Sequence, residues 1–238
     1  MINRVHTSAS SQIELPLRPS PVELGPGIKK KNNIWRFWSY KAGGRIVTCY
    51  GPWEFENAKR LEEDRDVLAW CEQPLKIPKA RKDGTAYVLD FWAYRSCGTQ
   101  EYGEVKPESE MVESEDGNLE PADWAAVRKA VDRLGGKPVV VSDAYLDDMS
   151  YLLSNWDHII GHVARAYYHD DRALRESILN LIAKRPPISL GEIESYHASS
   201  FGDDIRAQTF RLYQEGRVSA PLKDQPVDRC LRFRPTGD

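Results

Sequence analysis

Three carboxylates and one lysine stand out because their types and spacing suit metal-assisted chemistry. Asp90 lies inside the apolar run 87–93, where an ionised carboxylate is costly unless it meets a cation or a hydrogen-bond donor. Glu104 and Lys106 are two residues apart in a segment that predicts a strand, so their side chains point to the same face. Glu54 lies earlier in the chain, on a predicted amphipathic helix.

Together these four residues suit the hydrolysis of a phosphodiester. That reaction needs a water nucleophile and relief of charge on the phosphate, and carboxylates that hold Mg²⁺ supply both. We expect Asp90, Glu104 and Glu54 to bind Mg²⁺, for which Mn²⁺ could substitute. Lys106 would orient the water or stabilise the transition state. A lone Glu-x-Lys more often forms a cross-strand surface pair, so the hypothesis depends on all four residues together.

Apolar periodicity predicts the elements that position these residues. A helix is expected from Pro52, because apolar side chains recur at near-helical spacing with Glu and Lys between them. Its periodic positions are Trp53, Phe55, Ala58, Leu61 and, at its far end, Leu68. Strands are expected as a pair within 34–50 about the turn 42–44, as an extended segment at 73–78, and as buried runs at 87–93 and 101–105.

The following region predicts an α/β layer. Segment 107–120 is acidic and poor in apolar residues, so we expect a solvated loop. Segment 121–134 has helical spacing and stops at two glycines, and the β-branched run 139–141 predicts another strand. Segment 143–168 is again helical in character.

The C-terminal residues predict a winged helix-turn-helix. Three helices are expected, the first from Asp171, the second over 190–196 and the third over 204–215, and strands near Val218 and at 230–233 could pair as a wing. The third helix carries side chains suited to phosphates and base edges. Those that we predict to bind DNA are Arg206, Gln208 and Arg211. An adaptor surface for another protein is an equally good interpretation.

Composition sets the remaining expectations. We predict three parts: a flexible basic arm at 1–33 with Lys29–Lys31, an endonuclease domain at 34–169 and the winged-helix domain at 170–238. The net charge of −3 gives no global attraction to nucleic acid, so any such contact must be local. No membrane span or secretory signal is evident, which predicts a cytoplasmic protein. The four cysteines lack the spacing of a disulfide framework or a zinc site.

The order of these motifs resembles the PD-(D/E)xK nuclease superfamily and, within it, the TnsA-type endonucleases of heteromeric transposases. The run Asp64–Pro74 is similar to that family's Asp-x-x-Val and Gln-Pro motifs, and it follows a helix with a catalytic Glu. Counting back from Pro74 selects Glu54 over Glu56 as that acid, with Glu56 left as an alternative. The segments 89–91 and 104–106 resemble the family's Pro-Asp-Phe and Glu/Gln-Val-Lys motifs, with Leu89 in place of Pro.

The resemblance implies a restriction-endonuclease-like nuclease core with Glu54, Asp90, Glu104 and Lys106 as its catalytic set. We also predict that Gln73 supports these residues without binding the metal itself. It implies cleavage of the 5' ends, the non-transferred strands, of a mobile element in cut-and-paste transposition. The implied partners are transposon-end DNA, a DDE-type transposase (TnsB-like) and an AAA+ regulator (TnsC-like). Two alternatives stay open: a stand-alone restriction or repair nuclease, and a non-catalytic DNA-binding or adaptor protein that works through the winged helix.

Overall fold

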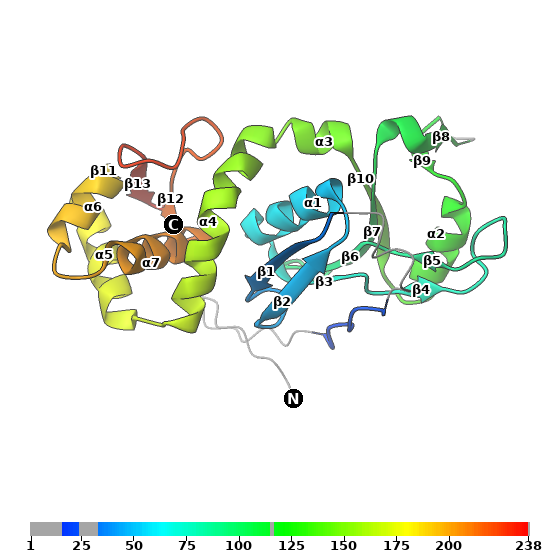
Figure 1. The fold of residues 1–238 in the computed structure, drawn as a ribbon, viewed down its shortest axis with the longest axis horizontal. Coiled ribbons are helices and arrows are strands. Elements are labelled where there is room, and N and C mark those ends of the chain that lie inside the picture. The colour runs from blue at the N-terminus through cyan, green and yellow to red at the C-terminus, as the bar shows by residue number, and fades with distance from the viewer. Residues whose placement is uncertain (1–15, 24–32, 115–116, 238) are drawn as a thin grey trace.

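A four-stranded mixed sheet forms the centre of the N-terminal half of the protein, which lies to the right in Figure 1. The computed structural model describes residues 16–23, 33–114 and 117–237. The sheet order is β10-β7-β6-β3, in which β10 runs parallel to β7 and the other pairs are antiparallel. Its strands are β3 (Val67–Glu72), β6 (Phe91–Arg95), β7 (Gln100–Lys106) and β10 (Lys137–Ser142). The predicted α/β class is therefore confirmed.

Helices cover both faces of this sheet. One face packs under α1 (Pro52–Glu63) and α3 (Asp143–Asp147), through an apolar cluster that includes Trp70, Phe91 and Val105. The other face packs under α2 (Trp124–Asp132), through a cluster that includes Trp92 and Val127. Both faces of the strands are therefore buried, as expected for a sheet between two helical layers.

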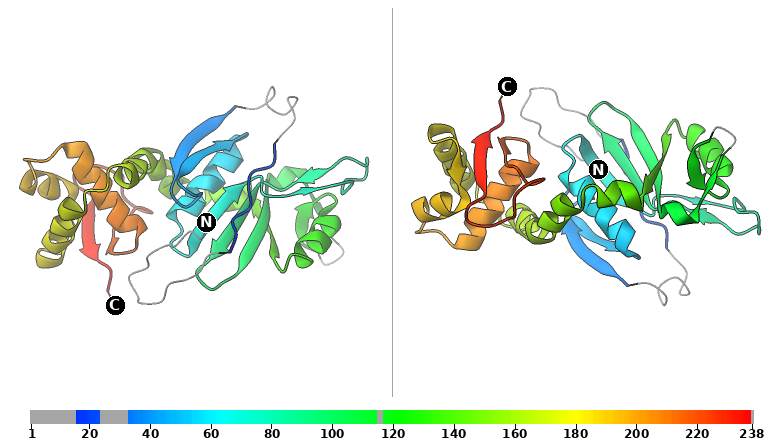
Figure 2. Two further views of the ribbon diagram at one scale, coloured as in Figure 1. Left: turned by 90° about the horizontal axis from the view of Figure 1, so that it is seen from below. Right: turned by 90° about the horizontal axis from the view of Figure 1, so that it is seen from above.

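Three hairpins complete this half of the chain. The first, β1 (Trp35–Ser39) with β2 (Arg45–Cys49), packs on α1. The second, β4 (Lys76–Ile77) with β5 (Tyr87–Val88), connects β3 to β6 and extends away from the domain in both views of Figure 2. The third, β8 (Met111–Glu113) with β9 (Leu119–Pro121), follows the short 3₁₀ helix Glu108–Glu110.

Three sequence-based expectations differ from the structure. The predicted helix ends at Glu63, and Leu68 lies in strand β3, which we did not predict. The expected continuous strand 87–93 is interrupted at Leu89 and Asp90, and its two parts, β5 and β6, pair with different partners. The expected loop 107–120 contains the 3₁₀ helix and the third hairpin.

The C-terminal part has the order of elements that we expected. It comprises α5 (Arg172–Lys184), β11 (Ile188–Ser189), α6 (Leu190–Tyr196), α7 (Gly202–Gln214), β12 (Val218–Ser219) and β13 (Arg232–Pro235), and its three short strands pair in the order β11-β13-β12. The long helix α4 (Ser150–Tyr168) joins the two halves. Trp156 and Ile159 of α4 pack in the C-terminal core, whereas Leu153 packs with the sheet, so α4 contributes to both.

Specific polar contacts connect the two halves. The buried Glu62 carboxylate, on α1, accepts hydrogen bonds from Trp70 Nε1 at 2.7 Å and from Gln214 Nε2, on α7, at 2.9 Å. The rings of Tyr40 and Tyr167 stack with centroids 4.0 Å apart. These contacts hold the C-terminal unit against the end of α1.

Part of the predicted N-terminal arm lies against the core. Arg18 Nη2 donates to the Lys41 carbonyl at 2.8 Å, and the Val22 N–H donates to the Gln73 carbonyl at 2.8 Å. The cluster Lys29–Lys31 lies outside the described residues. In the part of the chain that is described, no helix is both long and apolar enough to span a membrane.

Candidate active site

Asp90 occupies the bend between β5 and β6, and its backbone and side chain are both fixed to β7. Its N–H donates to the Gly103 carbonyl at 2.9 Å, and its Oδ2 accepts from the Val105 N–H at 2.8 Å. Its carbonyl accepts from the Gln73 N–H at 2.9 Å. The apolar run 87–93 gave no sign of a break in the strand. The bend at Asp90 nevertheless orients this carboxylate.

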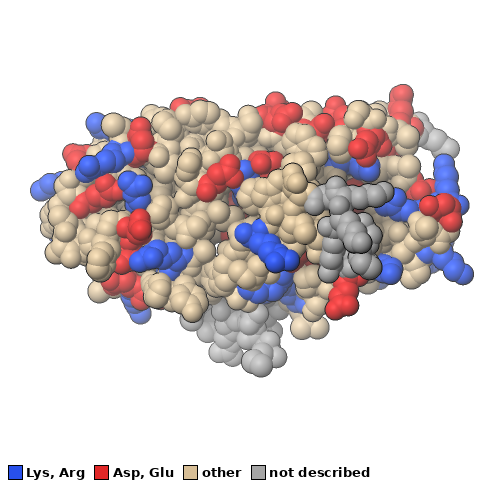
Figure 3. All heavy atoms as spheres, in the orientation of Figure 1, with Lys and Arg blue, Asp and Glu red and all other residues tan. Residues whose placement is uncertain are grey.

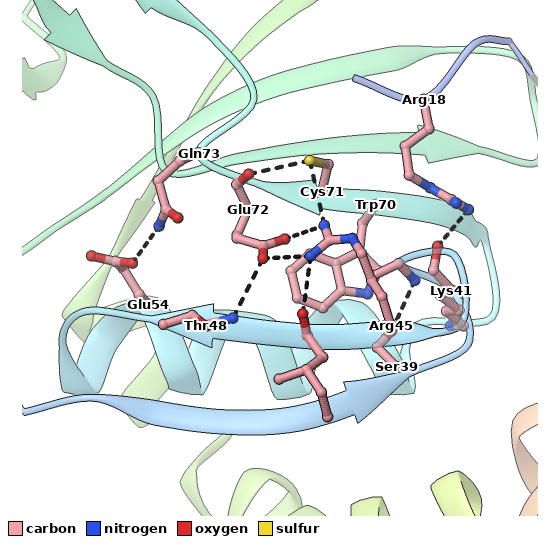
Figure 4. Close-up of polar contacts among 12 residues, drawn as sticks. Arg18, Ser39, Lys41, Arg45, Thr48, Glu54, Trp70, Cys71, Glu72 and Gln73 are labelled. Atoms are coloured by element: carbon pink, nitrogen blue, oxygen red, sulfur yellow. Dashed lines mark hydrogen bonds and ion pairs between the residues drawn. The ribbon is translucent and has the colours of Figure 1, made fainter. Parts of the chain in front are cut away.

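Glu54 reaches the same place from the first turn of α1. The Pro at the start of α1 suits the first helical position, and Glu54 follows it in the turn where a carboxylate meets free backbone N–H groups. Its Oε2 accepts from the Tyr50 N–H at 3.1 Å and from Gln73 Nε2 at 2.9 Å, as Figure 4 shows for Gln73. Glu54 and Asp90 line one small cavity. The alternative acid, Glu56, pairs with Lys59 at 2.9 Å and does not line that cavity.

Glu104 and Lys106 extend from β7 as their spacing predicted. Glu104 is buried, at 7% exposure, and no described residue forms a hydrogen bond with its Oε2. Lys106 is more open, and its Nζ forms an ion pair with Glu110 Oε2 at 2.8 Å. An exposed pair of this kind contributes about 1 kcal/mol or less, so the lysine can leave it at little cost.

The carboxylates at this site perturb one another. Burial raises the pKa of Asp90 well above its usual range, and the neighbouring carboxylates of Glu104 and Glu54 raise it further, against the hydrogen bond from Val105. Burial raises the pKa of Glu104 to about 7, with Lys106 acting in the opposite direction. Burial also raises the pKa of Glu54, opposed by its two hydrogen bonds. Mutually repelling, desolvated acids mark a candidate functional site and favour a bound cation.

The donor set suits a hard divalent cation. Three carboxyl groups offer oxygen ligands, and Glu104 Oε2 is a buried acceptor to which no group in the described part of the chain donates. Among the residues that the structure describes, no three His, Cys, Asp or Glu side chains are already arranged as a metal-binding group. We therefore expect side-chain rotation of Glu54 or Glu104 to accompany metal binding, with Asp90 held in place by the backbone of β7.

Gln73 bonds Glu54 through its side chain and Asp90 through its backbone. It is buried, and its φ of 38° places it in the left-handed region, where non-glycine residues are uncommon. This conformation lets its N–H bond Asp90 while its side-chain amide bonds Glu54. Gln73 thus positions two of the proposed metal ligands.

Our sequence reasoning missed two polar features near the site. The Glu72 carboxylate lines the cavity and accepts two hydrogen bonds from the Arg45 guanidinium, and a weaker contact from the Thr48 N–H measures 3.4 Å (Figure 4). The Tyr87 hydroxyl is among the groups that lower the pKa of Glu104. Glu72 was detectable as a charged residue in an apolar run directly before Gln73.

The three predicted DNA-binding residues of α7 all bond other residues of the protein, and one of them is buried. Gln208 is 1% exposed, donates to the His169 carbonyl at 3.1 Å and accepts from Arg175. Arg211 stacks over Tyr167 and bonds Asp170, and Arg206 bonds Glu194 at 2.7 Å. The assignment of Gln208 as a DNA contact is therefore wrong, and both arginines are engaged within the protein. The polar sequence of α7 predicted a DNA-binding face, whereas these side chains bond neighbouring elements of the protein.

Comparison with known proteins adds no relative. No protein-family model matches the chain, and no curated protein matches it at a significant level. The interpretation of the site therefore depends on its residues and their geometry.

Proposed function

We propose that this protein is a metal-dependent DNA endonuclease, a phosphodiester hydrolase whose site comprises Glu54, Asp90, Glu104 and Lys106. The observation that carries the proposal is the position of Asp90. Its carboxylate is fixed to β7 by the Val105 N–H and interacts with both other acids, which come from α1 and β7. Buried carboxylates close to one another repel, which destabilises the folded protein. A bound cation offsets this repulsion, so such a cluster is typical of a cation-binding site.

The residues of this chain would divide the chemistry among them. Asp90, Glu104 and Glu54 would hold Mg²⁺ or Mn²⁺, which when bound lowers the pKa of a coordinated water and offsets charge on the phosphate. Asp90 stays fixed through its hydrogen bond to the β7 backbone. Gln73 keeps the Glu54 carboxylate turned toward the cavity. Lys106, once released from Glu110, is the cation that can orient the attacking water or stabilise the charge that develops on the phosphate oxygens.

The finer architecture belongs to the same proposal. We infer a restriction-endonuclease-like core around the mixed sheet and a winged helix-turn-helix in the C-terminal unit. Support for the latter comes from α6 and α7, joined by a short turn, and from β12 and β13, which pair as a wing would. The burial of α7 against α4 and α1 favours a docking role for this unit over direct reading of bases.

The biological role that we propose is cleavage of the 5' ends of a mobile element, in the cytoplasm, together with a DDE-type transposase of the TnsB kind and under an AAA+ regulator of the TnsC kind. It derives from the resemblance of the sequence motifs to TnsA-type endonucleases. The same site in a stand-alone restriction or repair nuclease would cut DNA without a partner. Dependence on the partner transposase distinguishes these two roles.

The test is Mg²⁺-dependent nicking at the element's 5' ends, with and without the partner transposase, by the wild type, Asp90→Ala and Lys106→Ala. We expect nicking only with the partner, and loss of it in both variants while folding is preserved. Nicking by the wild type alone would support the stand-alone nuclease. Unchanged nicking in both variants would assign the cleavage to the partner and overturn the proposed function.

A further inference from the structure

The hairpin β4–β5, residues 75–88, is a basic projection beside the candidate site. In Figure 2 it extends beyond the rest of the domain, and in Figure 3 Lys and Arg side chains lie at the end of the molecule where Figure 1 shows this hairpin. It carries four basic side chains against a single acid, Asp83, in a chain whose net charge is −3. The basic residues, all exposed, are Lys76, Lys79, Arg81 and Lys82.

Both ends of the hairpin are anchored in the candidate site. Gln73, which bonds Glu54, lies just before it, and Asp90 lies just after it. At its base the Leu89 N–H donates to the Leu75 carbonyl at 3.0 Å. The position of the hairpin relative to the carboxylates is therefore set by the backbone that also positions them.

The tip of the hairpin has an ordered turn. The Arg81 N–H donates to the Thr85 carbonyl at 3.2 Å, and the Gly84 N–H returns to the Arg81 carbonyl at 2.9 Å. The Lys82 N–H donates to Asp123 Oδ2, at the start of α2, at 3.3 Å. Because the backbone of the turn is already ordered, less conformational entropy is lost when its exposed lysines bind a ligand.

One basic side chain links the hairpin to the acids. The Arg81 guanidinium lies over the Tyr87 ring, 4.8 Å from its centroid, and its positive charge helps to lower the pKa of Glu104. One of the four basic side chains of the hairpin therefore acts on an acid of the candidate site, and the three exposed lysines belong to the same hairpin. Such an arrangement suits a polyanion that places one phosphate at the carboxylates of the candidate site. The adjacent phosphates of the same polyanion would then lie alongside the basic hairpin.

We propose that the β4–β5 hairpin binds the phosphate backbone of duplex DNA next to the phosphate that is cleaved. This inference rests on the proposed function, because it takes DNA as the substrate of the adjacent site. The contacts would be to phosphates, without reading of sequence, since lysine ammonium groups act on phosphates as point charges. The hairpin would supply the local attraction that the overall charge of −3 lacks.

The test is the salt dependence of DNA binding by the full chain, with Ca²⁺ in place of Mg²⁺ and a short duplex as the probe. The variant Lys76→Gln, Lys79→Gln, Lys82→Gln removes three exposed charges and leaves Arg81 in place. Each phosphate that the variant no longer neutralises should reduce the slope of log affinity against log salt by about 0.9, so we expect a reduction of about two to three.

The matched control removes three exposed lysines that lie outside the hairpin: Lys137, Lys184 and Lys223, each to Gln. Its slope should stay near that of the wild type. An equal slope for the hairpin variant and the wild type would overturn the hairpin proposal, as would an equal reduction in both triple variants, which would mean a general effect of charge. A selective reduction in the hairpin variant would support it, even if Mg²⁺-dependent nicking by the wild type is absent and the proposed nuclease function fails.

Discussion

Replacing Glu104 by Gln should stabilise the metal-free protein, and the gain should depend on pH. The folded protein holds the Glu104 proton with a pKa of about 7, against an ordinary value of 4.5. Because the folded pKa is the higher one, the wild type loses stability as pH rises from about 4.5 to about 7. The difference corresponds to about 3 kcal/mol as an upper value, since each pKa unit is worth about 1.4 kcal/mol.

The assay is urea unfolding in EDTA at several pH values between 4 and 8. Near pH 4 the wild type and Glu104→Gln should differ little, because the carboxyl is protonated in both folded and unfolded chains. By pH 8 the Gln variant should be the more stable by up to about 3 kcal/mol. Glu113→Gln, an exposed acid on β8, serves as the control and should show no such trend. A Gln variant that is equally or less stable than the wild type at pH 8 would refute the reasoning.

Three further variants test the packing at Gly103, the contact between the two halves at Glu62 and the role of Lys106. Gly103→Ala would place a Cβ 2.1 Å from the Phe91 ring. It should therefore destabilise the fold by about 3 kcal/mol or more in urea unfolding and reduce nicking activity. Normal stability of this variant would contradict the close packing of Gly103 against Phe91. Glu62→Ala should cost about 3 kcal/mol or more in thermal unfolding, because it removes the acceptor of the buried Trp70 Nε1 and one of the two acceptors of the Gln214 amide. A smaller cost would mean that this link between the halves is weak. Lys106→Met should abolish nicking and change stability by about 1 kcal/mol or less; retained nicking would exclude the proposed role.

The elements with clear periodicity could be predicted from the sequence. Helix α1 begins at Pro52 as expected, and β7 contains Glu104 and Lys106 on the predicted strand. Both signals are local: proline at the first helical position and alternation along a strand depend only on neighbouring residues. The four residues of the candidate site were therefore assigned to the correct elements, apart from the bend at Asp90.

The features that depend on tertiary contacts could not be predicted in this way. Strand β3 is buried on both faces, with Trp70 toward α1 and Cys71 toward α2, so it lacks the alternation that would have distinguished it from a continuing helix. The break before β6 arises because β5 pairs with β4 and β6 with β3 and β7. The polar residues of α7 looked like a DNA-reading face, but partners distant in sequence engage them: Arg175 bonds the buried Gln208, and Glu194 and Asp170 bond the two arginines.

Metal binding by the purified chain tests the proposed site most directly, because it needs neither a partner protein nor a known DNA sequence. The measurement is a calorimetric titration with Mn²⁺ and with Mg²⁺ at pH 8, comparing the wild type with Asp90→Asn and Glu104→Gln. We expect binding by the wild type, release of protons as the acids lose their raised pKa values, and loss of binding in both variants. Absence of binding in the wild type, or equal binding in all three proteins, would contradict the assignment of these carboxylates as metal ligands.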